Sequence, residues 1–371
     1  MKTFFNLIQE VQKQGRCHQC GGCVTFCSAI NYGALDLDSD GKPFYADIDK
    51  CIECGICYVI CPETTELDEE IKKNAEWSAP SGRITGTSIA RARDLIVREK
   101  GTDGGVVTAI LLHLFDTGKI NGAIVSKSTD QGRIPWCAKT REEIIDAAGS
   151  HFDHSQGMAN FGDAYSTFSP SVSALSEIRK EGLSRVAFVG TPCQINSIRK
   201  MQALGVVPAD AIEICLGLFC SGNFIMTRDT FRDAEKKYGI VYDEIEKLNI
   251  KENFIVALST GERKELPLEA VEGTKRTACH YCTDFSAEYA DISFGGLGAD
   301  DGWTTVVTRS PKGRAVFAEA LATTLENFKY QNNTRYATTA EDKMINASRR
   351  KKETARQKLQ ELKSSGTRVI G

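Results

Sequence analysis

The chain has 371 residues, of which 41% are hydrophobic and 26% charged, and its formal net charge is −3. These values are typical of a folded globular protein with room for two or three domains, and they exclude disordered, collagen-like and coiled-coil classes. The near-neutral charge lacks the basic footprint of nucleic-acid binding. No apolar run reaches the roughly 18 residues of a membrane helix, and the amphipathic start does not resemble a secretory signal. We expect a cytoplasmic protein without membrane insertion, and peripheral attachment to a membrane complex stays open.

The first predicted unit is a cysteine repeat. Eight of the 14 cysteines lie between Cys17 and Cys61, in two copies of the pattern C-x2-C-x2-C-x3-C. This is the ligand run of bacterial ferredoxins with two 4Fe–4S clusters, in which the last cysteine of each run binds the other cluster. We therefore predict one cluster on Cys17, Cys20, Cys23 and Cys61, and a second on Cys51, Cys54, Cys57 and Cys27.

Two alternatives for this repeat stay open. Zinc sites favour two separated C-x2-C pairs, and disulfides favour small secreted chains. One detail departs from the ferredoxin pattern, because Ser28 stands where a proline usually follows the fourth cysteine, whereas Pro62 is present in the second run. We expect this change to affect local rigidity and reduction potential rather than ligation.

The segment Ser78-Ala-Pro-Ser-Gly-Arg-Ile84 indicates a linker, so we place the ferredoxin-like domain at residues 1–80. Beyond it, strand-like and helix-like segments alternate, which is typical of α/β proteins. We predict a mixed α+β and α/β body over residues 81–335 and a C-terminal helical tail, solvated or docked, over residues 336–371. Expected helices span residues 106–118, 173–180 and 195–201; expected strands span 122–126, 185–190, 212–219, 254–259, 291–294 and 304–308.

Four cysteines of the body are placed to meet in space. Two form a C-x2-C pair and two follow strand-like segments, whose carboxyl ends form ligand crevices in α/β sheets. These four thiols fit a third cluster, while a zinc site or a catalytic thiol at Cys193 stays open on spacing alone. The predicted ligands are Cys193, Cys220, Cys279 and Cys282, whereas Cys137 and Cys215 are expected to be small core residues.

Six short motifs are spread between about residue 88 and residue 325. They are Thr102-Asp-Gly-Gly-Val-Val-Thr108, Val189-Gly-Thr-Pro-Cys-Gln194, Leu218-Phe-Cys220, Cys279-x-x-Cys-x-Asp-Phe285, Ala290-Asp-Ile-Ser-x-Gly295 and Gly302-Trp-Thr-Thr-Val-Val. Together they resemble the beta subunits of the hydrogenases and dehydrogenases that use the deazaflavin coenzyme F420. With the ferredoxin repeat in front, the chain is similar to the input subunit of a reduced-F420 dehydrogenase or to the beta subunit of a formate dehydrogenase.

The resemblance implies that the body binds one FAD and one 4Fe–4S cluster, with the four body cysteines as ligands. The residues themselves agree at one point, because a Gly-Gly pair before a helix offers free N–H groups and a positive dipole end to a pyrophosphate. No G-x-G-x-x-G is present, so an ordinary dinucleotide-binding fold is not expected. The implied FAD contacts are Asp103, Gly104, Gly105, Val106, Val107 and Thr108, together with Gly190, Thr191, Pro192 and Gln194.

Lys127 follows the expected strand 122–126. The resemblance implies that it contacts an FAD phosphate or the acidic tail of F420, and the alternative is an ordinary solvated lysine. No catalytic residue is predicted, because positioning and exclusion of water supply most of the effect in hydride transfer.

Coenzyme F420 carries a hydride, iron–sulfur clusters carry single electrons, and a flavin exchanges both. We therefore expect an iron–sulfur flavoprotein subunit that transfers electrons between reduced F420 and a partner through FAD and three clusters. The expected partners are subunits of a hydrogenase, formate dehydrogenase, heterodisulfide reductase or membrane quinone or phenazine reductase. Two alternatives stay open: the same body with another two-electron donor or acceptor, and an electron-transfer adaptor without a substrate of its own.

Overall fold

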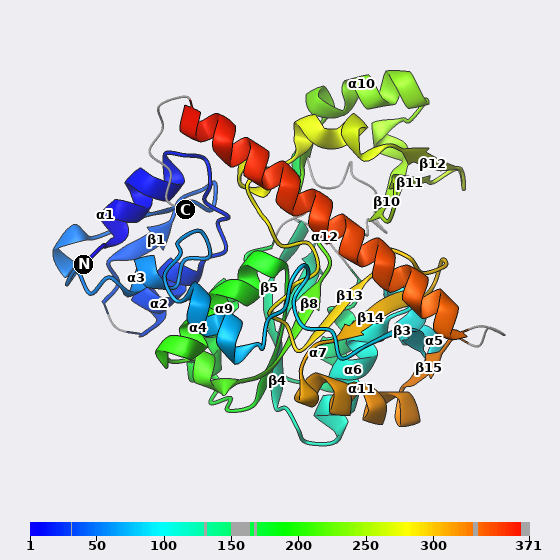
Figure 1. The fold of residues 1–371 in the computed structure, drawn as a ribbon, viewed down its shortest axis with the longest axis horizontal. Coiled ribbons are helices and arrows are strands. Elements are labelled where there is room, and N and C mark those ends of the chain that lie inside the picture. Colours follow the sequence, from blue (N-terminus) through cyan, green and yellow to red (C-terminus); the bar gives the residue numbers. More distant parts are fainter. Residues whose placement is uncertain (31, 130–131, 150–163, 167–168, 329–332, 365–371) are drawn as a thin grey trace.

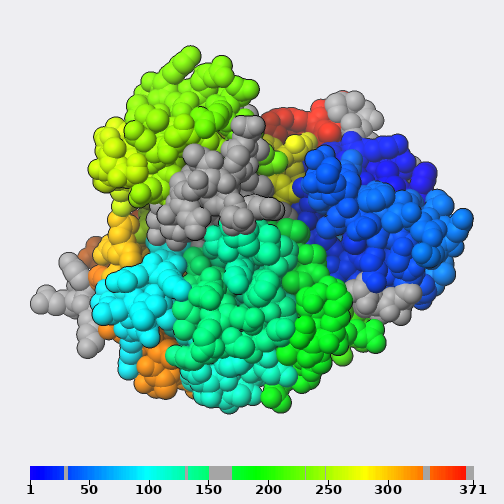
Figure 2. Space-filling model, turned by 180° about the vertical axis from the view of Figure 1, so that it is seen from behind, coloured from blue at the N-terminus to red at the C-terminus, as the bar shows by residue number. Residues whose placement is uncertain are grey.

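The computed structural model describes residues 1–30, 32–129, 132–149, 164–166, 169–328 and 333–364. The chain folds into an N-terminal ferredoxin-like domain, an α/β body that carries a smaller lobe, and a long C-terminal helix (Figure 1). Seen from behind, the N-terminal domain and the lobe stand out from the body as separate masses (Figure 2). The predicted fold class is confirmed.

The two cysteine runs of the N-terminal domain build the same local structure, a loop that turns at a glycine and then starts a helix. Gly21 and Gly55 have φ angles of 85° and 72°, in the left-handed region that glycine adopts without steric cost. A hairpin separates the two runs. The helices and strands are α1 (Phe4–Leu7), α2 (Gly22–Ile30), β1 (Leu35–Leu37), β2 (Pro43–Tyr45), α3 (Ile56–Val59) and α4 (Asp68–Asn74).

One eight-stranded sheet, in the order β15-β3-β14-β13-β8-β7-β4-β5, forms the centre of the body. The strands β13, β8, β7 and β4 are parallel, and antiparallel strands extend both edges. The carboxyl ends of the parallel strands therefore meet at one edge of the sheet, where ligands bind in open α/β folds. The strands are β3 (Gly86–Ala92), β4 (Gly122–Thr129), β5 (Gly132–Ala138), β7 (Val186–Gly190), β8 (Ile212–Leu218), β13 (Ile292–Gly295), β14 (Thr304–Thr308) and β15 (Leu325–Asn327).

Helices cover both faces of the sheet. One apolar core lies between the sheet and α6 (Val106–Asp116), α7 (Arg141–Asp146) and α11 (Pro311–Thr323), and α5 (Leu95–Lys100) leads into α6. A second core lies under α8 (Leu175–Lys180) and α9 (Pro192–Leu204). The second core also contains Cys20, Phe26 and Ile60, so the N-terminal domain is packed against the α8–α9 side.

The lobe has an apolar core of its own, built from buried residues between Phe224 and Val271. The sequence predicted only the strand that became β11, because the rest of the lobe consists of short elements without clear periodicity. The domain limits stay predictions. The lobe elements are β9 (Ile225–Thr227), α10 (Arg228–Tyr238), β10 (Ile245–Ile250), β11 (Phe254–Leu258) and β12 (Arg263–Leu266), and β9 pairs with β6 (Ala164–Ser166).

The helical tail is one continuous helix, α12 (Asn333–Ser364), which crosses the body towards the N-terminal domain (Figure 1). Ala340, Met344, Ser348 and Ala355 are at most 1% exposed, and their spacings of four, four and seven residues place them on one face. The helix is thus docked along this face rather than solvated. Among the helices of the described ranges, none has the length and apolarity of a membrane span.

Candidate functional site

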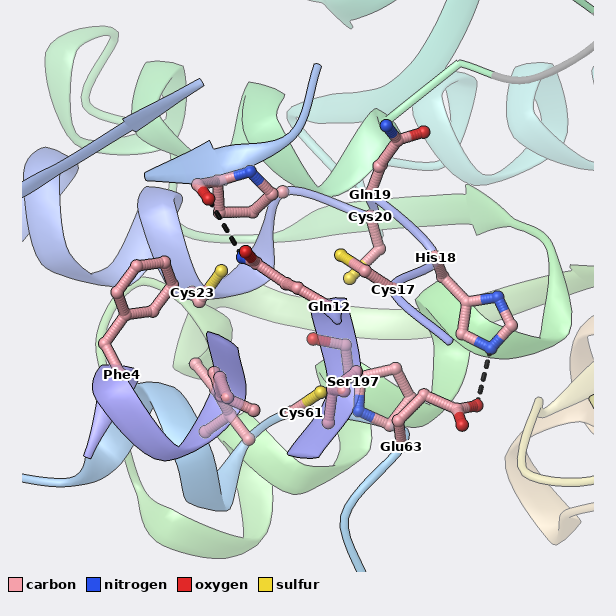
Figure 3. A pocket seen from close by; sticks show the side chains of 16 residues that line it. Phe4, Gln12, Cys17, His18, Gln19, Cys20, Cys23, Cys61, Glu63 and Ser197 are labelled. Carbon is pink, nitrogen blue, oxygen red and sulfur yellow. Dashed lines mark hydrogen bonds and ion pairs between the residues drawn. The ribbon is translucent and has the colours of Figure 1, made fainter. Parts of the chain in front are cut away.

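A cavity in the N-terminal domain is lined by three cysteines of the first run and the last cysteine of the second run (Figure 3). Cys17, Cys20, Cys23 and Cys61 lie around about 440 Å³ of space free of protein atoms, part of it open to solvent. Burial raises the pKa of all four thiols. A raised pKa means that forming a thiolate here costs free energy. Metal coordination offsets this cost, because a coordinating thiol is deprotonated outright.

A second cavity is lined by the complementary set, Cys51, Cys54, Cys57 and Cys27. The crossing follows from the geometry of α2, since Cys23 and Cys27 lie about 6 Å apart along the helix and border different cavities. The structure thus brings together both sets of four that the spacing predicts. Within the described ranges, no three His, Cys, Asp or Glu side chains converge as the ligands of a single metal ion would.

The four body cysteines meet at the carboxyl edge of the sheet. Cys193 is the second residue of α9, Cys220 lies two residues after the end of β8, and Cys279 and Cys282 lie between the lobe and β13. The pKa of Cys220 is raised to about 12, first by burial and then by the nearby thiols of Cys279, Cys282 and Cys193. The Lys351 ammonium acts in the opposite direction and lowers this pKa. Three distant segments therefore bring four thiols within electrostatic reach of one another.

Polar groups of the body point at these sulfur atoms. The backbone N–H of Asn223 donates to Sγ of Cys279 at 3.3 Å, and its side-chain amide lies 3.8 Å from Sγ of Cys220. The Thr191 hydroxyl lies 3.4 Å from Sγ of Cys193. Donors of this kind stabilise thiolates and influence the potential of a bound cluster. The sequence did not reveal the role of Asn223, because the turn after β8 is what places it.

His18 connects the first cavity to the body cysteines. It lines the cavity, and its Nε2 lies 2.7 Å from Oε1 of Glu63 (Figure 3). Although burial lowers the pKa of His18, the charges of Cys193 and Glu63 and a hydrogen bond with Cys279 raise it well above its usual value. Arg276 donates to the His18 carbonyl at 3.2 Å and also to the Gln19 side chain. The loop that carries Cys17 and Cys20 is thereby fixed against the body.

Helix α9 forms a shared wall between the two groups of thiols. Cys193 belongs to the body group, and four residues later Ser197 lines the first cavity. Lys200 has a fully buried side chain and donates to the carbonyls of Cys61 and Thr64 at 3.1 and 2.6 Å. Residues three and four apart share one helix face, so a single face of α9 spans both groups.

The residues assigned to FAD lie in two places along the same edge of the sheet. Asp103 precedes α6, and its carboxylate faces the lobe, 3.3 Å from Nδ2 of Asn249 and 3.8 Å from Nζ of Lys251. A Cβ on Gly296, just after β13, would lie 2.4 Å from Oδ2 of Asp103. Asp103 therefore lies in the space between the carboxyl edge and the lobe.

The glycine pair before α6 also has a packing role. Gly104 and Gly105 have φ angles of 77° and 70°, and a Cβ on either would lie 2.4 Å from a carbonyl oxygen, of Gly302 or Val97 respectively. Val106 belongs to the apolar core, Val107 packs against it, and Thr108 is buried. A ligand here would meet the free backbone N–H groups of the first turn of α6.

The second place is the start of α9. Gln194 accepts a hydrogen bond from the N–H of Thr191 at 3.0 Å and donates to the carbonyl of Ser169 at 2.6 Å. Both ends of the Gln194 side chain therefore stabilise the turn from Gly190 through Thr191 and Pro192 into the helix. Lys127 on β4 lies over the ring of Trp136 on β5, 4.4 Å from its centre, so this ammonium already has an aromatic partner.

Three buried polar atoms beside these segments have no hydrogen-bond partner among the described residues. They are the Thr102 hydroxyl, the Trp136 indole N–H and the Ser169 hydroxyl. Each neighbours an assigned FAD segment: Thr102 precedes Asp103, Trp136 stacks on Lys127, and Ser169 binds Gln194. Unpaired buried polar groups cost stability, so the residues present fit a polar ligand at this edge.

The segments that carry these features match models of one protein family. Residues 87–160 and 183–332 match the N-terminal and C-terminal parts of the coenzyme F420 hydrogenase/dehydrogenase beta subunit. The chain belongs to this beta-subunit family. Residues 9–74 match a 4Fe-4S dicluster domain. The resemblance inferred from the motifs is confirmed, and the chain is an iron–sulfur oxidoreductase subunit.

Individual relatives extend this result. The chain is 31% identical, over 83% of its length, to a coenzyme F420-dependent sulfite reductase of Methanocaldococcus jannaschii, but it spans only 46% of that protein. It is 34% identical to a coenzyme F420 hydrogenase subunit beta of Methanococcus voltae, over 64% of this chain and 81% of the relative. A chain of the F420-reducing NiFe hydrogenase complex from Methanosarcina barkeri matches with a TM-score of 0.65 and 25% identity, covering 80% of this chain and 98% of that chain.

Proposed function

We propose that this chain transfers electrons between reduced coenzyme F420 and a partner subunit of a multisubunit oxidoreductase, through FAD and three 4Fe–4S clusters. The supporting observation is the continuity of the thiol groups. Cys279 of the body is hydrogen-bonded to His18, His18 lines the first cavity, and α2 leads from that cavity to the second. A chain of closely spaced one-electron sites is the arrangement that electron transfer requires.

The two N-terminal cavities and the carboxyl edge of the sheet suggest which residues would hold each group. The body cluster would be held by Cys193, Cys220, Cys279 and Cys282, and the other two clusters by the crossed sets in the N-terminal domain. FAD would lie at the carboxyl edge, along residues 103–108 and 190–194. Bound there, it would accept a hydride and release single electrons.

The chain contributes binding and water exclusion at this edge. Lys251 holds the lobe to the body through Asp103, Asp301 at 2.8 Å and the carbonyl of Ala299 at 3.2 Å. A ligand between lobe and sheet would thus be covered from both sides. Such positioning supplies most of the rate effect when no protein acid or base takes part.

The first experiment is an anaerobic mixing of the flavin-loaded full chain with reduced coenzyme F420. We expect flavin and cluster absorbance to bleach together, and no bleaching with NADH or NADPH. The matched variant Cys193→Ala should keep about eight iron atoms per chain instead of about twelve, and its N-terminal clusters should no longer be reduced by F420.

The outcomes separate the alternatives. Bleaching by NADH but not by reduced F420 would identify the same body with another two-electron donor. A chain without flavin that is reduced only by a partner protein would be an electron-transfer adaptor. Unchanged reduction of the N-terminal clusters in Cys193→Ala would contradict the proposed order of electron transfer.

A further inference from the structure

Helix α12 lies beyond the three matched family models, the last of which ends at residue 332. It nevertheless reaches the body cysteines. We propose that α12 is a functional wall of the body cluster site, and that Lys351 is a positioning residue whose fixed positive charge raises the reduction potential of that cluster. This inference rests on the proposed function, because it presupposes a cluster on the four body cysteines.

The contacts of Lys351 join two of the segments that carry the cysteines. Its ammonium donates to the carbonyl of Cys220 at 2.6 Å and to the carbonyl of Asp284 at 2.8 Å. The first carbonyl belongs to a predicted ligand and the second lies two residues after Cys282. An ammonium has three donors, so two of them fix the turn after β8 to the loop before β13.

The positive charge of Lys351 lies beside the cysteine-bearing segments. Its ammonium is 2.6 Å from the backbone oxygen of Cys220 and 2.8 Å from that of Asp284, two residues after Cys282. A cation near a cluster stabilises the reduced state, which carries one more negative charge, and local charge is one determinant of cluster potentials.

The helix holds this lysine in place from both sides along the chain. Ser348, one turn earlier, is buried against Ser286, with the two hydroxyl oxygens 3.4 Å apart. Lys352 pairs with Glu288 and donates to the carbonyl of Thr283 at 3.4 Å. Glu288 in turn accepts from the indole N–H of Trp77 at 2.7 Å. The docked face of α12 therefore fixes the loop over residues 283–288 and delivers Lys351 to the cysteines.

The test is a redox titration of the full chain followed by electron paramagnetic resonance, with iron content measured in parallel. Three variants are compared with the wild type: Lys351→Met, Lys351→Arg and Lys358→Met. Lys358 is a matched control on the same helix, because its ammonium is exposed and its ion pair is with Glu361 rather than with the backbone of a cysteine-bearing segment. The signal that Cys193→Ala removes identifies the body cluster.

We expect Lys351→Met to lower the reduced-to-oxidised ratio of the body cluster about tenfold at a fixed potential, which is about 59 mV for one electron. The two N-terminal clusters and the Lys358→Met protein should keep wild-type potentials, and Lys351→Arg should restore most of the shift. Selective loss of the body cluster in Lys351→Met, with retention in Lys351→Arg, would also support the role of Lys351.

An unchanged body-cluster potential in Lys351→Met at full iron content would overturn the inference, and so would an equal shift of all three clusters. Absence of a third cluster from the wild type itself would instead refute the proposed function. The two failures are therefore distinguishable.

Discussion

The N-terminal domain and the body each gather groups of four cysteines, but they do so by different means. In the N-terminal domain, eight cysteines between residues 17 and 61 line two adjacent cavities through two loops and two short helices. In the body, the cysteines come from the start of α9, the end of β8 and the loop before β13, and the whole lobe lies between Cys220 and Cys279.

The difference extends to the surroundings of the thiols. The first cavity is lined mostly by residues of its own domain, such as Phe4, Leu7 and Ile60. The polar partners of the body cysteines come from four separate segments and are Asn223, Thr191, His18 and Lys351. A locally encoded site is robust to changes elsewhere in the fold, whereas an assembled site depends on every segment that reaches it.

The largest effect is expected from the crossing of ligands in the N-terminal domain. Cys61→Ala and Cys27→Ala should each lose one cluster, about four iron atoms per chain. Because Cys61 lines the cavity beside His18, only Cys61→Ala should block electrons between the body and the remaining N-terminal cluster. Iron analysis and rapid-mixing reduction check this. If Cys27→Ala were the blocking variant instead, the ligands would not cross.

In the body, the buried carboxylate of Asp291 joins α9 to β8. It pairs with Arg199 of α9 at 2.9 Å and accepts from the N–H of Cys215 on β8 at 2.8 Å. Burial raises the pKa of Asp291, but these partners outweigh it and hold the pKa below its usual value. The contribution of ionised Asp291 to the stability of the fold is therefore present above about pH 4 and is lost only below it. Asp291→Asn should lower the free energy of unfolding by about 3–5 kcal/mol, measured by urea denaturation at pH 7.

An exposed carboxylate provides the control for Asp291. Asp301 pairs with Lys251 and Arg263 but its side chain is 65% exposed, and surface pairs contribute about 1 kcal/mol or less. Equal losses in Asp291→Asn and Asp301→Asn would mean that burial does not distinguish the two pairs.

The contact between the two regions can be tested at His18. His18→Leu removes the partner of Glu63 and the hydrogen bond to Cys279, so we expect a stability loss of about 1–3 kcal/mol and slower electron transfer from the body to the first cluster. His280→Leu is a matched control, because His280 pairs with Glu272 at 3.2 Å beside the same cysteine but away from Glu63. Transfer rates that fall equally in both variants would argue against a specific role of His18.

The smallest effect concerns pH. Burial and the neighbouring Asp284 raise the pKa of Glu288 from 4.5 to about 7, although Lys352 and Trp77 act in the opposite direction. The folded state then binds more protons than the unfolded state between these values, so Glu288 makes stability fall as the pH rises from about 5 to 7. Glu288→Gln should reduce the difference in the free energy of unfolding between pH 5 and pH 7 by about 1–2 kcal/mol, measured from urea midpoints at both pH values. A slope that steepens would contradict the raised pKa.

The sequence predicted the parts of the fold that depend on near neighbours. Both ferredoxin runs, α6 and the central strands β4, β7, β8 and β13 were expected within a few residues, because their spacing and apolar periodicity are local properties. The outer strands β15, β3 and β5, and the short elements of the lobe, were missed because pairing with distant segments stabilises them more than their own pattern does.

The sequence by itself determined the family and was enough to predict the crossed cysteine sets and the group of four body cysteines, since fixed spacings and motifs carry that information. Only the tertiary structure placed His18 between two groups of thiols, gave the Gly104-Gly105 pair a packing role and brought Lys351 to the carbonyl of Cys220 from 131 residues away. The physical reason is that hydrogen bonds and charges act through space over a few ångströms, and the distance between two residues along the chain does not determine which of them will meet.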